Sequence, residues 1–382
     1  MTNSSESYSK DFLVSGIEDS KDYILLTGGA GFIGVHTAYE LLKANYNVII
    51  LDNFGKQDIK IEDHRNLQGL QKLYETIPKN MLNTKPELII KKKDLLNIHD
   101  IASVFLQHKI STVIHFAALK SVNESISNPL EYYDNNINGL INLLKIMKTY
   151  DCNNFIFSSS ATVYGSSNDL PFREDSQTGI GITNPYGQTK FMAEQILKDY
   201  SNSHKKFKAI MLRYFNPVGA HSSGLIGEIP NGAPNNLFPY LLEVGIGKRK
   251  ELSIFGNDYT TDDGTCIRDF IHVTDLAIGH LASLTYIINS DFLSDNMYNK
   301  NYGFYEVFNL GTGVGVSVLE FVETFISVTG VEIPYKFVEK RPGDVMSSYA
   351  NVDKARKVLG WKTEKTLSDI CIDGWNFFEK KL

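Results

Sequence analysis

Short runs of apolar residues alternate with amphipathic stretches from about residue 22 onward. The runs are rich in Ile, Val, Leu and Phe and are continuous, which is typical of strands that are buried on both faces. Because helical stretches separate them, the pattern favours a parallel sheet covered by helices on both sides, the doubly wound α/β fold. The predicted strands span 23–26, 47–51, 88–90, 112–116, 154–157 and 209–212.

The pattern of the remaining chain suggests how the domains are organised. Residues 128–150 carry apolar side chains at helical spacing, and Asn128 and Pro129 suit a cap and a first helical residue. After about residue 214 the pattern becomes irregular, and Gly, Pro and Asn accumulate over 216–239. We therefore predict a sheet domain over 21–214 and a smaller, mainly substrate-binding domain over 215–382. Residues 1–20 predict a disordered tail, and the polar stretches near 55–86 and 287–304 predict surface insertions.

Composition mainly excludes classes of partner. The chain has 382 residues, 42% of them apolar, and a formal charge of -6 without a basic face, which argues against nucleic acid. The run of lysines at 91–93 indicates a solvated strand edge. Three dispersed cysteines and nine histidines without ligand spacing predict neither a disulfide framework nor a metal site. With no apolar stretch near the roughly 20 residues of a membrane span and no signal-peptide pattern, we expect a cytoplasmic protein without a membrane partner.

A glycine-rich segment follows the first predicted strand and opens a helix that is expected to end near Ala44. Gly28, Gly31 and Gly34 would let the backbone turn sharply and approach a pyrophosphate, which the N–H groups of the helix N-terminus then bind. Asp52 ends the second strand, 24 residues after Gly28. A carboxylate there accepts hydrogen bonds from the adenosine ribose and repels a 2′-phosphate. The combination predicts a Rossmann site for NAD rather than NADP.

A catalytic group is predicted from a run of hydroxyl residues and a later Tyr-x-x-x-Lys. Ser160 lies just beyond a buried strand, and the i, i+4 spacing places Tyr186 and Lys190 on one face of a helix. Lowering a tyrosine pKa from about 10 to near 7 requires about 3 units, or roughly 4 kcal/mol, and a nearby ammonium and the positive nicotinamide both favour the phenolate. Tyr186 is therefore the predicted general base, with Ser160 as donor and proton relay and Lys190 also holding the nicotinamide ribose.

Taken together, these motifs resemble those of the extended short-chain dehydrogenase/reductase family and, within it, the UDP-galactose 4-epimerases. The resemblance covers nearly the whole chain, from about Tyr23 to Trp375. It implies a homodimer formed through the helices near 128–150 and 184–202, and a chain that crosses between its two domains more than once. It is carried by VIHFAALKSVNES (113–125), PLEYYDNN (129–136), FSSSATVYG (157–165), NPYGQTK (184–190), LRYFNPVGAH (212–221), PNNLFPY (234–240), IFGNDYTTDDGTCIRDFIHV (254–273) and RPGD (341–344).

The resemblance also implies which residues line each part of the site. Ser160 and Tyr186 are expected to carry out the acid/base chemistry. The NAD site is expected to include Phe32, Ile33, Asp52, Asn53, Asp94, Leu95, Phe116, Ala117, Lys120, Asn135, Ser158, Tyr186, Lys190 and Tyr214. The UDP-sugar is expected to contact Asn216, Asn236, Leu237, Phe255, Arg268, Arg341 and Asp344, together with Lys120, Ser160 and Ser348.

The residue types agree with these roles. Arg268 and Arg341 are guanidinium groups beside glycine-rich turns, suited to a pyrophosphate. Asn236 and Leu237 begin an apolar helical run whose N-terminal amides can face a phosphate. Phe255 offers a face on which uracil can stack. Pro342 departs from the family's usual Arg-Glu at this place and removes a backbone donor.

The segment after the serines separates related activities. Nucleotide-sugar 4,6-dehydratases and decarboxylases carry an acidic residue there, whereas this chain has Ser160-Ala161-Thr162. The resemblance therefore implies oxidation and re-reduction at C4, interconverting UDP-glucose and UDP-galactose with a tightly bound NAD. A bulky Tyr at the position of Ser348 accompanies restriction to unacetylated sugars in the family. The small residue here predicts that UDP-GlcNAc and UDP-GalNAc are also substrates, unless Tyr349 fills the space.

Other functions remain open at this stage. One is a 4-epimerase for another UDP-sugar, such as a glucuronate or a pentose, although the sequence shows no additional cation for a glucuronate. Another is a catalytically silent NAD-binding regulator, which predicts loss of Tyr186 or Lys190, yet both are present. A net dehydrogenase would release NADH and would need an exchangeable cofactor.

Overall fold

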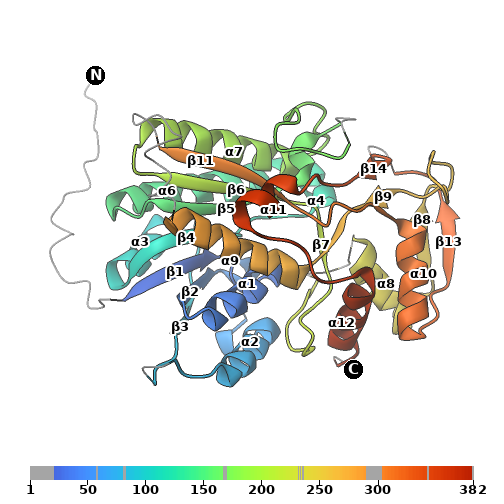
Figure 1. Ribbon diagram of the computed structural model, residues 1–382, viewed down its shortest axis with the longest axis horizontal. Coiled ribbons are helices and arrows are strands. Elements are labelled where there is room, and N and C mark those ends of the chain that lie inside the picture. Colours follow the sequence, from blue (N-terminus) through green and yellow to red (C-terminus); the bar gives the residue numbers. More distant parts are fainter. Residues whose placement is uncertain are drawn as a thin grey trace.

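The computed structural model describes residues 21–56, 59–80, 83–166, 170–230, 232, 234, 236–289, 303–341 and 344–380. The tail predicted over 1–20 and most of the insertion predicted near 287–304 lie outside these residues. Figure 1 shows a central sheet flanked by helices, with a smaller group of strands and helices from the C-terminal half beside one end of it.

Seven parallel strands form the central sheet, in the order β11-β6-β5-β4-β1-β2-β3. The six predicted strands all occur, which confirms the doubly wound fold. The seventh, β11, belongs to the C-terminal half of the chain, so the chain crosses back to the sheet, and the domain division near residue 214 stays a prediction. The strands are β1 (Asp22–Thr27), β2 (Asn47–Asp52), β3 (Leu88–Lys92), β4 (Lys109–His115), β5 (Asn154–Ser160), β6 (Lys208–Tyr214) and β11 (Phe304–Leu310).

Helices cover both faces of the sheet because alternate strand residues enter two separate apolar cores. Ile24 and Leu26 of β1 lie in one core, and Tyr23 and Leu25 lie in the other. The first core is completed by α1 (Phe32–Lys43), α2 (Arg65–Thr76) and α9 (Val273–Asn289). The second is completed by α3 (Ile98–Gln107), α6 (Gly139–Thr149) and α7 (Pro185–Ser203).

The polar stretch near 55–86 is not a surface insertion throughout, so this prediction was wrong in part. It contains α2, and three of its leucines, Leu67, Leu70 and Leu73, are buried in the first core. Their i, i+3, i+6 spacing gives the helix one apolar face in spite of its polar composition. The lysines at 91–93 behave as predicted, because β3 is the edge strand and the Lys93 ammonium pairs with Asp100.

The helix predicted over 128–150 is interrupted. It consists of α5 (Pro129–Tyr133), a π-helical turn η4 (Asp134–Asn138) and α6. Leu130 is 81% exposed, and the Asn128 side chain makes no capping hydrogen bond. The wider turn brings the buried Asn136 side chain against the Leu119 backbone, where it donates to the carbonyl and accepts from the N–H. A π turn of this kind often marks a functional site.

The C-terminal half forms a third apolar core, which includes Phe238, Phe321 and Phe325. Its strands are short and form three small sheets. These strands are β7 (Asn216–Val218), β8 (Leu252–Phe255), β9 (Ile267–Arg268), β10 (Phe270–His272), β12 (Val316–Ser317), β13 (Tyr335–Val338) and β14 (Ser347–Ser348). Its helices are α8 (Leu237–Gly245), α10 (Val318–Thr329), α11 (Asp353–Leu359) and α12 (Leu367–Glu379). The short elements α4 (Val122–Ser127), η2 (Phe54–Lys56), η3 (Ile61–Asp63) and η5 (Ala161–Tyr164) lie in the first half.

Candidate active site

The glycine turn after β1 has the geometry that a backbone-bound pyrophosphate requires. Gly28 has a φ of +68°, and a Cβ there would lie 2.5 Å from the Ala117 nitrogen. A Cβ on Gly34 would lie 2.6 Å from the Gly29 Cα, so glycine is needed for the helix to pack on the turn. Gly31 caps α1 in an extended conformation. The N–H groups of Phe32, Ile33 and Gly34 therefore begin the helix as the unpaired donors that bind anions.

Asp52, at the end of β2, connects the glycine turn to this strand through hydrogen bonds. One carboxylate oxygen accepts a hydrogen bond from the Ala30 N–H at 3.0 Å, and the other accepts one from the Phe54 N–H at 2.8 Å. Burial raises the pKa of Asp52, and these two hydrogen bonds oppose the rise. A carboxylate oxygen has further acceptor capacity, so Asp52 retains lone pairs for the ribose hydroxyls that the sequence predicts.

The remaining residues predicted for the NAD site lie at the carboxyl ends of neighbouring strands. The Asn53 amide donates to Asp94 at 3.2 Å, and the N–H groups of Phe116 and Ala117 both donate to the Thr27 carbonyl. Leu95 is buried beside this group, and Asn135 lies in the π turn η4, where its amide donates to Asn136. Tyr214 ends β6, and its hydroxyl hydrogen-bonds with the buried His280.

Ser160, Tyr186 and Lys190 come together where β5 ends and α7 begins. Asn184 caps α7 by accepting a hydrogen bond from the Gly187 N–H at 2.8 Å, which fixes the first turn of the helix. The Ser160 hydroxyl lies beside the Tyr186 phenol, where it lowers the pKa of the phenol, and it accepts a hydrogen bond from the Thr162 N–H at 3.2 Å. The Lys190 ammonium donates to the Ser158 carbonyl at 2.5 Å.

Two lysines and one hydroxyl set the electrostatic surroundings of Tyr186. Burial raises the pKa of Tyr186, whereas the hydrogen bond from Ser160 and the positive charge of Lys120 lower it. Lys120 is thus a second cation near the phenol besides Lys190, whose Nζ lies 5.9 Å from the centroid of the Tyr186 ring, and the effect assigned to the Tyr-x-x-x-Lys pair stays a prediction. Lys120 comes from the segment before α4, and its ammonium pairs with Glu228 at 3.0 Å.

Lys190 itself is held in a desolvated place. Its side chain is buried, and this burial lowers the pKa of Lys190 to about 7, with Glu194 opposing the effect. The neighbouring His115 is also buried, and burial together with the charge of Lys190 lowers its pKa to about 3. His115 is therefore neutral at physiological pH, and its Nδ1 hydrogen-bonds with Thr27 at 2.7 Å.

Part of the predicted substrate wall forms one cluster of charged and aromatic side chains. The Arg341 guanidinium lies over the Phe255 ring, 3.7 Å from its centroid. The Arg268 guanidinium lies 3.8 Å from the Asp344 carboxylate. It also donates a hydrogen bond to the backbone carbonyl of the preceding residue, Ile267, at 2.8 Å. One face of Phe255 is therefore covered by a guanidinium, which limits the uracil stacking predicted for this ring to its other face. Pro342 lies outside the described residues.

The other predicted substrate residues lie on three separate elements. Asn216, in β7, donates to the Asp269 carbonyl through both its N–H and its amide. Asn236 caps α8 without a side-chain hydrogen bond, and Leu237 is the first helical residue, as predicted. Ser348 lies in β14, where it is paired with Arg268 of β9.

Several residues that hold this site together were not predicted from the sequence. Asn136 joins the Lys120 segment to α7, because its amide also donates to the Thr189 hydroxyl at 3.0 Å. Glu228 pairs with Lys120, and Glu194 pairs with Arg213. Asn136 and Arg213 fall inside the motifs PLEYYDNN and LRYFNPVGAH. Their position in these motifs was the only feature of the sequence that could have indicated a role for them. It does not show which side chains they contact.

Comparison with known proteins identifies the family of this chain. A family model described as GDP-mannose 4,6 dehydratase matches residues 25–373. The UDP-glucose 4-epimerase of Bacillus subtilis (strain 168) is 45% identical over 354 residues, which are 93% of this chain and 96% of the relative. This chain belongs to the UDP-glucose 4-epimerase family. The resemblance inferred from the sequence motifs is thereby confirmed.

Solved structures of UDP-glucose 4-epimerases share the fold over almost the full length. The protein from Stenotrophomonas maltophila, with bound NAD and formylated UDP-arabinopyranose, has a TM-score of 0.84 and 38% identity over 94% of this chain and 98% of its own. The protein from Bifidobacterium longum, in complex with NAD+ and UDP, has a TM-score of 0.80 and 43% identity over the same shares. The epimerase members, rather than the dehydratase in the name of the family model, agree with the absence of an acidic residue from Ser160-Ala161-Thr162.

Two further observations concern the described part of the chain. There, no group of three or more His, Cys, Asp or Glu side chains is arranged to hold a metal ion. None of the described helices combines the length and apolar character that crossing a membrane requires. Cys152, Cys266 and Cys371 are all buried and free.

Proposed function

We propose that this protein interconverts UDP-glucose and UDP-galactose by transient oxidation at C4 of the sugar, using a resident NAD. The observation that carries the proposal is the grouping of Ser160, Tyr186, Lys120 and Lys190 at the carboxyl edge of the sheet, next to the glycine turn. This is the edge at which open α/β sheets bind their ligands. The protein acts in the cytoplasm as a homodimer.

The cofactor fits the residues that are present. The turn at Gly28 and Gly34 leaves no room for a Cβ, so the backbone can approach a pyrophosphate closely. The first turn of α1 supplies N–H donors, and Asp52 supplies acceptors for a ribose that lacks a 2′-phosphate. When bound, NAD would supply the hydride acceptor for oxidation of C4 and the hydride donor for its reduction. Because the net reaction is redox-neutral, no exchange of the cofactor is needed between turnovers.

The side chains of the catalytic group move and hold the proton. Tyr186 accepts the proton of the C4 hydroxyl as a general base, and the hydrogen bond from Ser160 and the charge of Lys120 stabilise its phenolate. Lys190, fixed on the Ser158 carbonyl, orients the nicotinamide ribose. When C4 is reduced from the opposite face, Tyr186 returns the proton to the sugar oxygen. With no carboxylic acid at 161–162, no elimination follows.

The site is expected to bind the UDP part of the substrate tightly and the sugar part weakly. Arg268 and Arg341 bind the diphosphate, Phe255 stacks on the uracil, and the N-terminus of α8 at Asn236 adds backbone donors. Holding UDP firmly leaves the sugar free to rotate about its link to the diphosphate. This rotation exposes both faces of C4 to the same hydride donor.

The substrate range includes the N-acetylated sugars. Ser348 is small, and the following Tyr349 packs against Gly315, where a Cβ would lie 3.4 Å from its ring. Tyr349 follows the end of β14 and its ring lies at Gly315, so we expect it to leave the space beside Ser348 open. This observation favours the larger pocket over the alternative in which Tyr349 fills it.

We expect Ser348→Tyr to lower kcat/KM for UDP-GalNAc by about 10- to 100-fold, because the added ring occupies the space of the 2-N-acetyl group. The value for UDP-galactose should fall less, which changes the ratio of the two. Steady-state kinetics with both sugars measures this ratio, and Ser348→Thr is the size-matched control. An unchanged ratio would remove Ser348 from the specificity pocket.

The experiment that tests the proposed function follows the sugar proton signals by NMR. Purified protein is incubated with UDP-galactose, and separately with UDP-GalNAc, without added nucleotide cofactor. Formation of UDP-glucose supports the epimerase with resident NAD, and formation of UDP-GlcNAc supports the broad substrate range. No conversion of UDP-galactose, with or without added NAD, would overturn the proposed function.

The proposed homodimer uses the surface formed by α6 and α7. A shallow groove between these helices is lined by the apolar parts of Ile141, Leu144, Lys145, Lys148, Ile196 and Tyr200. Met192, on the same helix as Ile196, is 39% exposed. Apolar side chains of this kind on adjacent helices favour the packing of a second helix pair against them.

We expect Ile196→Asp to convert the dimer to a monomer, because a charge at the centre of an apolar interface remains desolvated and unpaired. Sedimentation equilibrium measures the mass. Ile278→Asp is the control, since Ile278 is exposed on α9, which covers the opposite face of the sheet. A dimeric Ile196→Asp protein would place the interface elsewhere.

A further inference from the structure

Three consecutive serines of β5 contact three residues that follow one another at four-residue intervals along α7. The Ser158 carbonyl accepts from Lys190, the Ser159 hydroxyl donates to the Glu194 carboxylate at 2.5 Å, and the Ser160 hydroxyl lies beside the Tyr186 phenol. Two of these contacts involve groups assigned to the reaction. The third, between Ser159 and Glu194, joins the same strand and helix but touches no reacting group.

Glu194 is held in place by a buried ion pair. The guanidinium of Arg213, in the neighbouring strand β6, donates to both carboxylate oxygens, at 3.0 and 2.8 Å. Both residues are 4% exposed. Burying two charges costs desolvation that their attraction barely offsets, so such a pair adds little net stability. Its bidentate geometry does fix orientation, because the planar guanidinium admits one arrangement of the carboxylate.

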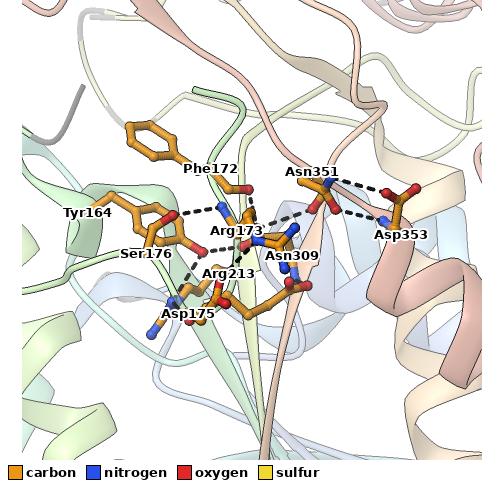
Figure 2. Close-up of polar contacts among 10 residues, drawn as sticks. Tyr164, Phe172, Arg173, Asp175, Ser176, Arg213, Asn309, Asn351 and Asp353 are labelled. Atoms are coloured by element: carbon orange, nitrogen blue, oxygen red, sulfur yellow. Dashed lines mark hydrogen bonds and ion pairs between the residues drawn. The ribbon is translucent and has the colours of Figure 1, made fainter. Parts of the chain in front are cut away.

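The third nitrogen of the Arg213 guanidinium, Nη1, binds the segment of chain that follows Ser160. It donates to the Tyr164 hydroxyl at 3.1 Å and to the Glu174 carbonyl at 3.0 Å. The Tyr164 hydroxyl donates in turn to Asn309 of β11 at 2.6 Å, as Figure 2 shows. Asn309 continues the network to the Phe172 carbonyl. Ser160 therefore lies in the chain between two residues that are connected to Arg213. Ser159 is connected through Glu194, and Tyr164 accepts a hydrogen bond from Arg213 directly. These two residues are called the anchors below.

We propose that the Glu194–Arg213 pair is a positioning unit that sets the register of α7 against β5, and thereby the contact between Ser160 and Tyr186. This inference rests on the proposed function, since it concerns the same reaction. Both residues are buried, and neither is among those assigned to NAD or to the UDP-sugar. A helix that slid or rotated slightly on β5 would keep its apolar packing but would separate the phenol from the hydroxyl. The pair therefore acts on the rate of the chemical step and not on the binding of UDP.

Ser159→Ala tests this unit, because it removes the anchor and leaves the ion pair and the reacting groups intact. We expect kcat for UDP-galactose to fall by about 10- to 100-fold, as small misplacements of reacting groups do, with KM nearly unchanged. Amide hydrogen exchange in 158–162 and 186–194 should become faster. Thr112→Val is the matched control, since the Thr112 hydroxyl is buried in the adjacent strand β4 and bonds no partner.

The outcomes are distinguishable. A kcat equal to that of Thr112→Val, with unchanged exchange, would overturn the positioning role. A wild-type protein that converts no UDP-sugar would overturn the proposed function, and hydrogen exchange alone would then decide whether Ser159 and Glu194 set the register. If Ser159→Ala does not fold, Tyr164→Phe removes the other anchor while keeping its ring, which stacks on Phe172 at 4.6 Å. The same loss of kcat without loss of KM is expected from it.

Discussion

Tyr186→Phe is expected to lower kcat for UDP-galactose by about 10³-fold, within the range that general-base catalysis contributes. The substitution removes one oxygen, the acceptor of the C4 proton, and leaves the ring and the helix cap at Asn184 in place. The lost interaction is made mainly in the transition state, so kcat and kcat/KM should fall together while KM changes little. Steady-state kinetics gives these values, and the NAD released on denaturation shows whether the cofactor site is intact.

The matched control for this variant is Tyr74→Phe. The Tyr74 hydroxyl donates to the Pro86 carbonyl at 2.9 Å, in α2 and away from the catalytic group. This variant should keep full activity. A Tyr186→Phe protein with wild-type turnover would remove Tyr186 from the role of base. If it also kept full function in cells, the silent NAD-binding regulator would become the better explanation of the fold.

Arg213→Met is expected to lower the free energy of unfolding by about 3–5 kcal/mol, the cost of leaving a buried carboxylate without its partner. Glu194 is 4% exposed and would then keep a hydrogen bond from Ser159 alone among its present partners. Chemical denaturation monitored by fluorescence measures the loss. Lys206→Met is the control, because the Lys206–Asp151 pair is almost fully exposed and such pairs add little.

The double variant Glu194→Leu/Arg213→Met separates stability from positioning. Replacing both charges with apolar groups should restore most of the lost stability, since the desolvation cost disappears with the charges. Activity should stay low, because neither new side chain can hold Ser159 and Tyr164. Recovery of both stability and kcat would show that the pair only fills space.

Local pattern was sufficient for the sheet, for the glycine turn and for the position of Tyr186 and Lys190 on one helix. Continuous apolar runs located six strands of the central sheet, since burial on both faces leaves no polar positions. The glycine turn was predictable because its conformation depends on neighbouring residues, as the φ of +68° at Gly28 shows. Tyr186 and Lys190 lie on one face of α7 because four residues are about one helical turn.

Prediction failed where a local pattern had two readings. The stretch near 55–86 is polar overall, yet α2 buries one face of three leucines in the core. The apolar spacing of 128–150 is compatible with one continuous helix, but the hydrogen bonds of Asn136 to Leu119 and Thr189 accompany a π turn. In both cases the packing partner decides, and it lies elsewhere in the chain.

The sequence by itself determined the fold class, the glycine turn with Asp52, and the shared helical face of Tyr186 and Lys190. Only the tertiary structure decided that Lys120 adds a positive charge near Tyr186, that Glu228 pairs with Lys120 across 108 residues of sequence, and that Arg213 connects Glu194 with Tyr164. The physical reason is the range of each interaction. Turns and helix faces follow from backbone geometry over a few residues, whereas ion pairs and pKa shifts depend on distances and burial that exist only once the chain has folded.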